Sequence, residues 1–244
     1  MPKSAGAIVS VIVPARNEAR NLESLIDEIR SALASRAHEI LIVDDGSADD
    51  TGEVIKTKRK QGASLRHLRH ARSLGQSAAI RTGVWHARGD IIVTLDGDGQ
   101  NDPAYIPKLL DALADAGPNA GLAMGQRKRR TDGTVKKLAS RFANGLRRTL
   151  LDDEAQDSGC GLKAVPTDVF RRLPYFDGWH RFIPALVRRE GKTLVWIDVI
   201  DRPRGHGRSN YGIFDRGLRG ILDLFGAWWL KRRFRGPAET KEVD

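Results

Sequence analysis

Three oxygen-bearing side chains follow one another at two-residue spacing in the run VTLDGDGQNDP, which covers residues 93–103. They belong to Asp96, Asp98 and Gln100. In an extended segment, residues two apart point the same way, so these side chains could offer three oxygens to one hard cation such as Mg²⁺ or Mn²⁺. The spacing therefore predicts a metal site that could hold a diphosphate.

Other residues of this run have structural interpretations. Gly97 and Gly99 leave room for a ligand to approach the backbone. Asp102 precedes Pro103, a pair typical of the N-cap and first position of a helix. An acidic turn between a strand and a helix is therefore the alternative to a metal site.

The elements that must position this run alternate between strands and helices. Apolar, β-branched runs predict strands at 8–14, 39–45, 65–68, 91–95 and 121–125, and apolar residues at helical spacing predict helices at 17–34 and 76–87. Ser47 is the expected cap of a further helix. This alternation predicts an α/β fold, with a mostly parallel sheet and helices on both faces.

Polar residues stand where the predicted strands end. Pro14, Arg16 and Glu18 end the first strand, and Asp45 ends the second. Ligands of open α/β sheets bind beyond the carboxyl ends of the strands, and a carboxylate such as Asp45 is suited to bind a base or a ribose. Neither the glycine-rich dinucleotide fingerprint nor a P-loop is present, which disfavours dehydrogenases and ATPases.

Composition narrows the partners and the compartment. The 244 residues, 40% of them hydrophobic, suit one large α/β domain with a C-terminal extension. The net charge of +10 suits anionic lipid, phosphorylated substrates or nucleic acid. Nucleic acid is disfavoured because aromatic platforms and groove-reading motifs are lacking. The single cysteine, Cys160, excludes an internal disulfide and fits the cytosol.

Three segments, in their order and spacing, resemble family 2 glycosyltransferases of the GT-A fold. They are VIVPARNE at 11–18, VDDGS at 43–47 and LDGDGQNDP at 95–103. Within that family, GQSAA at 75–79 and DSGCGLK at 157–163 resemble the polyprenyl-phosphate glycosyltransferases, the group that includes dolichyl-phosphate mannose synthase. The resemblance implies a nucleotide-binding GT-A catalytic domain over residues 1–212.

The resemblance also implies an activity. A sugar would pass, with inversion, from a UDP- or GDP-sugar to a polyprenyl phosphate of the undecaprenyl or dolichyl type, with Mg²⁺ or Mn²⁺ as cofactor. The protein would act as a peripheral protein on the cytoplasmic face of the cell membrane. The resemblance is also compatible with a multi-span membrane protein as its partner. The alternative is a soluble family 2 enzyme with a saccharide or protein acceptor.

Site residues follow from the resemblance position by position. The nucleotide sugar would contact Pro14, Arg16, Glu18, Asp45, Gln76, Asp96, Gly97, Arg204 and Asn210. The lipid phosphate would contact Arg127, Lys136, Ser140 and Arg204. The metal would contact Asp96, Asp98 and Gln100. The catalytic residues would be Asp98, Arg127 and Asp157.

Two of these assignments have open alternatives. Asp157 would lie nearest the anomeric carbon, or serve only as a turn residue. Asn210 stands where the family has a lysine, and Arg208 in the same loop could supply that charge. An ordinary basic surface loop is the alternative for this segment.

The C-terminal segment, residues 213–244, is the predicted membrane-surface element. Apolar residues recur there at helical spacing, namely Leu218, Ile221, Leu222, Phe225 and Trp229. The segment WWLKRR at 228–233 ends in three basic residues. Apolar residues at helical spacing beside a basic cluster predict an amphipathic helix at an anionic membrane surface. The alternative is a helix that packs on the domain or on a partner. No spanning helix is expected, and the six histidines are interpreted as surface residues.

Overall fold

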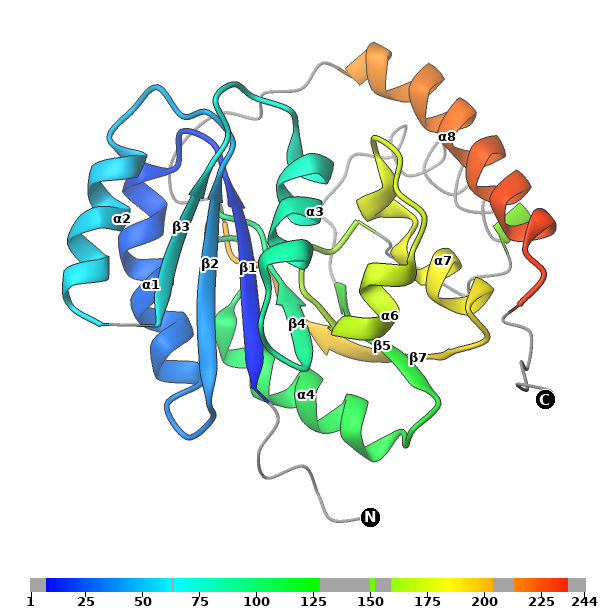
Figure 1. Cartoon of the computed structure of the whole chain (residues 1–244), viewed down its shortest axis with the longest axis horizontal. Helices are drawn as coiled ribbons and strands as arrows, with labels where there is room; N and C mark the ends of the chain where they lie inside the picture. Colours follow the sequence, from blue (N-terminus) through cyan, green and yellow to red (C-terminus); the bar gives the residue numbers. More distant parts are fainter. Residues whose placement is uncertain (1–7, 63, 128–149, 152–158, 204–212, 237–244) are drawn as a thin grey trace, which may run out of the picture.

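The computed structural model describes residues 8–62, 64–127, 150–151, 159–203 and 213–236, with backbone alone for 213–219. Seven strands form one sheet in the order β3-β2-β1-β4-β6-β5-β7 (Figure 1). The strands are β1 (Val9–Ala15), β2 (His38–Asp44), β3 (Leu65–Arg69), β4 (Ile91–Thr94), β5 (Ala120–Arg127), β6 (Lys163–Pro166) and β7 (Thr193–Val199). The α-helices are α1 (Ala19–Ala32), α2 (Thr51–Lys60), α3 (Gln76–His86), α4 (Ile106–Asp115), α6 (Thr167–Arg172), α7 (Ile183–Arg189) and α8 (Ile213–Arg233), and the 3₁₀ helices are η1 (Pro103–Tyr105) and η2 (Trp179–Arg181).

Strand direction brings many chain segments to one edge of the sheet. β1 pairs in parallel with β2 and β4, β2 with β3, and β5 with β7. β6 pairs antiparallel with both β4 and β5, so it alone runs against the other described strands. The carboxyl ends of six strands therefore meet the first residue of β6, Lys163, at one edge.

The core explains why β1 and β2 form the centre of the sheet. Most of their apolar residues, including Ile12, Ile40 and Leu41, are completely buried. A parallel strand covered on both faces needs such a continuous apolar run. The helices α1 and α2 cover one face and α3 covers the opposite one (Figure 1). The predicted α/β architecture with a mostly parallel sheet is confirmed.

Two predicted helix caps have different outcomes. Asp102 is confirmed as a cap, because its carboxylate accepts a hydrogen bond from the Ala104 N–H at 2.9 Å, directly before η1. Ser47 is wrong as a cap, since α2 begins at Thr51. The Ser47 hydroxyl instead accepts the N–H of Asn17 at 3.0 Å. A tertiary contact with the loop after β1 thus replaces the local one.

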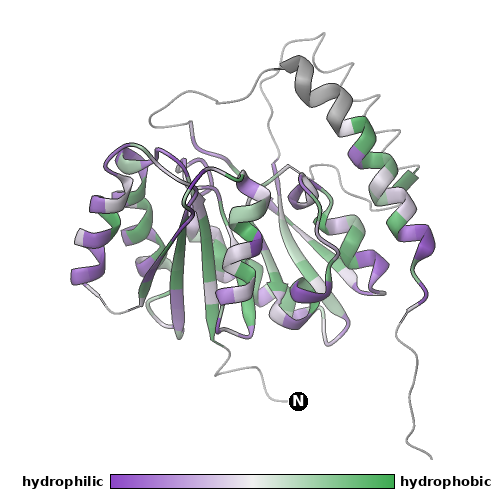
Figure 2. Ribbon diagram, turned by 45° about the horizontal axis from the view of Figure 1, so that its top comes forward, coloured by the Kyte–Doolittle hydropathy of each residue, from purple (hydrophilic) through white to green (hydrophobic). Residues whose placement is uncertain are grey.

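The helix α8 presents two different apolar faces to its surroundings. Leu224 and Ala227 are buried where α8 packs on α7, and the Arg189 side chain donates to the Leu230 carbonyl at 3.2 Å. Other apolar residues of α8 remain exposed, namely Ile221, Leu222, Phe225 and Trp229. Figure 2 shows apolar stretches along this helix. Packing on the domain, the alternative above, accounts for one face, and the membrane role stays a prediction.

Hydropathy also bears on whether the chain crosses a bilayer. Among the helices that the structure describes, none combines the length and the apolar character that a membrane span requires.

Packing between α3 and β1 gives a test of the core. A Cβ added at Gly83 would lie 2.5 Å from Cγ2 of Ile12, whereas one added at Gly220 of α8 would meet nothing within 4 Å. We expect Gly83→Ala to lower the free energy of unfolding by about 1–3 kcal/mol through overpacking. The control Gly220→Ala should be neutral or stabilise by up to about 1 kcal/mol. Urea denaturation measures both, and equal stability of the two variants would contradict this packing.

Candidate active site

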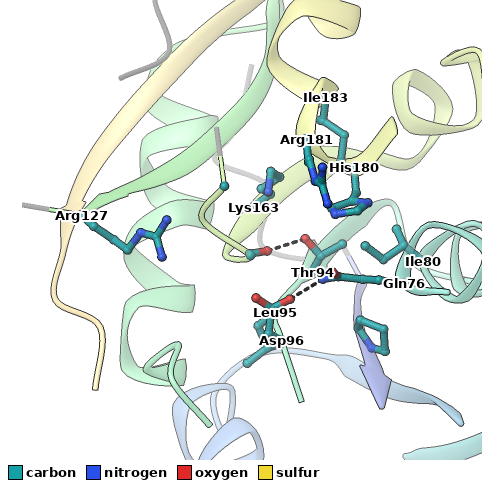
Figure 3. Close-up of a pocket in the computed structure, with 13 residues that line it drawn as sticks. Gln76, Ile80, Thr94, Leu95, Asp96, Arg127, Lys163, His180, Arg181 and Ile183 are labelled. Carbon is teal, nitrogen blue, oxygen red and sulfur yellow. Dashed lines mark hydrogen bonds between the residues drawn. The ribbon is translucent and has the colours of Figure 1, made fainter. Parts of the chain in front are cut away.

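A pocket of about 360 Å³ lies at the edge where the parallel strands end (Figure 3). Its lining comprises Pro14, Gln76, Ile80, Thr94, Leu95, Asp96, Arg127, Gly159, Gly161, Lys163, His180, Arg181 and Ile183. Four of the predicted site residues are among them: Pro14, Gln76, Asp96 and Arg127. They come from β1, the first turn of α3, the segment after β4 and the end of β5. The fold therefore brings together residues that are more than 100 positions apart in the sequence.

Asp96 is held in place from several directions. The Gln76 amide donates to its Oδ1 at 2.7 Å, and its own N–H donates to Asn101 Oδ1 at 3.1 Å. Burial, together with the negative charges of Asp98 and Asp201, raises the pKa of Asp96 to about 6. The positive charges of two other pocket residues, Lys163 and Arg127, partly offset this rise in pKa.

Asp98 does not continue the strand. β4 ends at Thr94 and a turn follows at 97–98, in which Asp98 Oδ1 accepts the Gln100 N–H at 3.1 Å. The premise of an extended segment with three parallel side chains is therefore wrong. Asp98 lines a second pocket of about 190 Å³ beside Arg202. The Gln100 carbonyl accepts the Arg202 N–H at 2.8 Å, which ties this turn to the segment after β7.

Glycines allow the segments around Asp96 to approach closely. A Cβ at Gly97 would lie 2.8 Å from the Pro14 carbonyl oxygen. One at Gly161 would lie 2.6 Å from Oδ2 of Asp96. A side chain at position 97 would push the turn away from β1. A side chain at position 161 would push the segment before β6 away from Asp96.

Asp96 and Asp98 are the carboxylates that a divalent cation could use. Among the described residues, no three His, Cys, Asp or Glu side chains form a metal-binding group. Mg²⁺ commonly takes one or two carboxylates and completes its coordination with water and substrate phosphates. The donor set fits such a cation, because bound positive charge would offset both the burial of Asp96 and its repulsion by Asp98, which raise the pKa of Asp96. The coordination role of the Gln100 side chain stays a prediction.

Arg127 lies at the end of β5, as the sequence predicts. Its guanidinium is 3.1 Å from Asp201, whose other oxygen accepts from Asn101 at 3.2 Å. Asn101 in turn accepts the Asp96 N–H. This chain of hydrogen bonds connects the ends of β4, β5 and β7. It also holds the positively charged guanidinium of Arg127, which lines the pocket.

The loop after β1 is braced by the loop after β2. Asn17, at a φ of 57°, accepts from the Ala48 N–H at 2.8 Å, and the Glu18 N–H donates to Thr51 at 3.1 Å. The Glu18 carboxylate accepts from Asn21 at 2.6 Å. Arg16 is exposed beside them. Contact of Arg16 and Glu18 with a nucleotide stays a prediction.

Asp45 has a structural task that the sequence does not reveal. Its two oxygens, almost fully buried, lie within 2.8 Å of hydrogen-bonding atoms of His70, Ser73, Leu74 and Gly75. Burial alone would raise the pKa of Asp45, but these hydrogen bonds outweigh it and hold the pKa below its ordinary value of 3.8. Asp45 thus fixes the 70–75 loop, which leads into Gln76, and its contact with a base or ribose stays a prediction.

Sequence reasoning missed three titratable residues of the pocket, Lys163, His180 and Arg181. Lys163 belongs to the DSGCGLK segment at 157–163, and its buried amine donates to the Cys160 carbonyl. The interpretation of His180 as a surface residue is wrong, because its side chain is only partly exposed, is bonded to Ser77 and lines the pocket. His70 is also wrong as a surface residue, since its Nδ1 is 2.7 Å from Asp45 and its Nε2 is 2.9 Å from Thr82. Histidine spacing along the chain holds no signal for such contacts.

Five of the predicted site residues have no described position. Lys136, Ser140, Asp157, Arg204 and Asn210 lie outside the described residues.

The hydrogen bonds to Asp45 predict a pH-dependent stability. A lowered folded-state pKa contributes stability that is present above the ordinary value of 3.8 and lost as the pH falls through the folded pKa. We expect Asp45→Asn to cost about 1–3 kcal/mol at pH 7 and much less at pH 3. The matched control is Asp50→Asn, since Asp50 makes no side-chain cap bond to α2. Urea denaturation at both pH values would refute this account if the two variants behaved alike.

Comparisons with known proteins identify the family of this chain. The family model of Glycosyl transferase family 2 matches residues 10–173. The dodecaprenyl-phosphate galacturonate synthase of Rhizobium johnstonii is 34% identical over 92% of this chain and 67% of its own. The undecaprenyl-phosphate 4-deoxy-4-formamido-L-arabinose transferase of Edwardsiella ictaluri is 34% identical over 84% of this chain and 63% of its own. The chain thus spans about two thirds of the length of these relatives.

A solved structure is similar over most of the chain. Glucosyl-3-phosphoglycerate synthase from Mycobacterium tuberculosis, in complex with Mn²⁺, uridine diphosphate and phosphoglyceric acid, has a TM-score of 0.70 at 21% identity and covers 95% of this chain and 81% of its own. At this identity the likeness shows the fold, and it confirms the predicted GT-A type. The family match covers more than half of the chain, and so the protein belongs to glycosyl transferase family 2.

Proposed function

We propose that this protein transfers a sugar from a nucleotide diphosphate sugar to the phosphate of a polyprenyl chain. The observation that carries the proposal is the charge arrangement of the pocket, where the Asp96 carboxylate shares one lining with the cations Arg127 and Lys163. Such a site can bind anionic groups on either side of a divalent cation. The names of both relatives above include a polyprenyl phosphate.

The reaction asks little of protein side chains. A phosphate monoester is already anionic at neutral pH, so the acceptor needs no strong base. Binding must instead bring two negatively charged substrates together, and cations achieve this by charge compensation and orientation. Arg127 would orient the acceptor phosphate, while Gln76 and Pro14 border the donor.

A divalent cation is part of the proposal. Asp96 and Asp98 would hold Mg²⁺ or Mn²⁺, and the ion would supply charge compensation for the nucleoside diphosphate that leaves. The structurally similar mycobacterial synthase was crystallised with Mn²⁺ and uridine diphosphate. We therefore favour a UDP-sugar as donor, with Arg16, Glu18 and Asp45 near the nucleotide.

A membrane surface is the proposed place of action. The exposed side chains of Phe225 and Trp229 lie on α8, whose last turn carries Arg232 and Arg233, and the Arg233 guanidinium lies 5.9 Å from the Trp229 ring centre. Aromatic and basic residues side by side suit the headgroup region of an anionic bilayer. We infer that residues 213–244 hold the domain, residues 1–212, on the cytoplasmic face. A multi-span partner stays a prediction without structural support.

The direct test is product detection by mass spectrometry. Purified protein is incubated with Mn²⁺ or Mg²⁺, undecaprenyl phosphate and a panel of UDP- and GDP-sugars. We expect a polyprenyl-phosphate sugar from one donor, and its loss when EDTA is added. Release of nucleotide that depends on a saccharide instead of the lipid would favour the soluble alternative.

Two substitutions should separate the roles of the pocket. Asp98→Ala should lower transfer by roughly 100-fold or more through loss of charge stabilisation. Arg127→Ala should chiefly raise the KM for the lipid phosphate and leave the KM for the donor near its wild-type value. Undiminished turnover of Asp98→Ala in metal-free buffer would overturn the metal assignment.

The membrane proposal predicts a loss of vesicle binding. We expect Phe225→Ser/Trp229→Ser to abolish co-sedimentation with phosphatidylglycerol vesicles without loss of folding, because both side chains are exposed. Trp85→Ser is the matched control, since Trp85 and Trp229 are both 54% exposed. Equal binding by the two variants would show that α8 is not the docking element.

A further inference from the structure

His180 is held in the pocket by a residue from a different part of the chain. It belongs to η2, and its Nδ1 lies 2.7 Å from the hydroxyl oxygen of Ser77, in the first turn of α3. The same hydroxyl oxygen accepts the Gly178 N–H at 2.9 Å, and the Ser77 carbonyl accepts from the Trp179 indole at 3.1 Å. Three hydrogen bonds thus fix η2 against α3, and they leave the His180 ring little freedom.

This arrangement determines which ring nitrogen carries the proton. The Ser77 hydroxyl is almost completely buried, so its hydrogen needs an acceptor. Gly178 offers only an N–H, which leaves Nδ1 of His180 as the acceptor among the partners of that hydroxyl. An imidazole that accepts at Nδ1 is protonated at Nε2 when neutral.

The electrostatic surroundings keep the ring neutral. Burial, with the positive charges of Arg181 and Lys163, lowers the pKa of His180 to about 3. Within the described part of the chain, the hydrogen bond to Ser77 is the one that His180 makes, and it uses Nδ1, so Nε2 donates to no described residue. The pocket therefore contains a fixed, uncharged N–H donor.

We propose that the Nε2–H of His180 recognises the donor sugar by donating a hydrogen bond to one of its hydroxyl oxygens. This inference rests on the proposed function and deepens it. Phosphate oxygens are matched by charged donors, and Arg127 and Lys163 line the same pocket. An uncharged donor suits an uncharged hydroxyl instead, so His180 is assigned to the sugar and not to either phosphate.

The test measures donor binding, which does not depend on the identity of the acceptor. Affinities are measured by calorimetry for UDP, UDP-glucose, UDP-galacturonic acid and GDP-mannose, with the metal-loaded protein. For the nucleotide sugar that the wild type binds most tightly, we expect His180→Phe to weaken binding about 10-fold. Binding of the matching nucleoside diphosphate should stay unchanged. His180→Gln, whose amide can reach the place of Nε2, should restore most of the loss.

Two outcomes would overturn the proposal. One is equal weakening of the sugar nucleotide and of its nucleoside diphosphate, and the other is no change in either. A failed polyprenyl-transfer assay would refute the proposed acceptor but not this donor contact.

A second measurement needs no substitution. Nitrogen-15 NMR of labelled histidine in the wild-type protein should show a neutral His180 with the proton on Nε2 down to pH 5. Addition of the nucleotide sugar should shift the Nε2 signal, whereas addition of the nucleoside diphosphate should not. A proton on Nδ1, or an Nε2 signal unaffected by the sugar, would contradict the proposal even if His180→Phe did not fold.

Discussion

The burial of β1 and β2 between two layers of helices is the constraint on which the rest of the structure depends. A strand covered on both faces cannot carry unpaired polar side chains, so hydrophilic residues are confined to the ends of these strands. Asp44 and Asp45 follow four consecutive buried apolar residues of β2, and Arg16 directly follows the last residue of β1. The chemistry of the protein is therefore concentrated at one edge of the sheet.

Environment gives two aspartates at this edge opposite properties. Asp45 is surrounded by hydrogen-bond donors, which favour its charged form, whereas burial and the neighbouring carboxylates disfavour the charged form of Asp96. The first carboxylate is suited to hold a loop permanently. The second is suited to receive positive charge from a ligand. Residue type alone would not distinguish them, and the difference arises from partners that the fold supplies.

Local patterns predicted the elements of the fold, because strand and helix periodicity is a property of short segments. The strands up to β5, the helix α3 and the cap at Asp102 could all be found in this way. The antiparallel insertion of β6 could not, since it depends on pairing between distant segments. That insertion brings Lys163 to the active edge. His180 escaped prediction for a similar reason, because its partner Ser77 lies 103 residues away.

Cys160 illustrates how the packing of this edge controls reactivity. Burial raises the pKa of its thiol to about 11, and it lies where β5 and β6 come together beside Gly125. A thiol that stays protonated is a poor nucleophile, and a buried one is out of reach of reagents. Alkylation of the folded protein therefore has to wait for local opening of the sheet. The rate at which the single cysteine of the sequence is alkylated therefore measures how often the pairing of β5 and β6 opens locally.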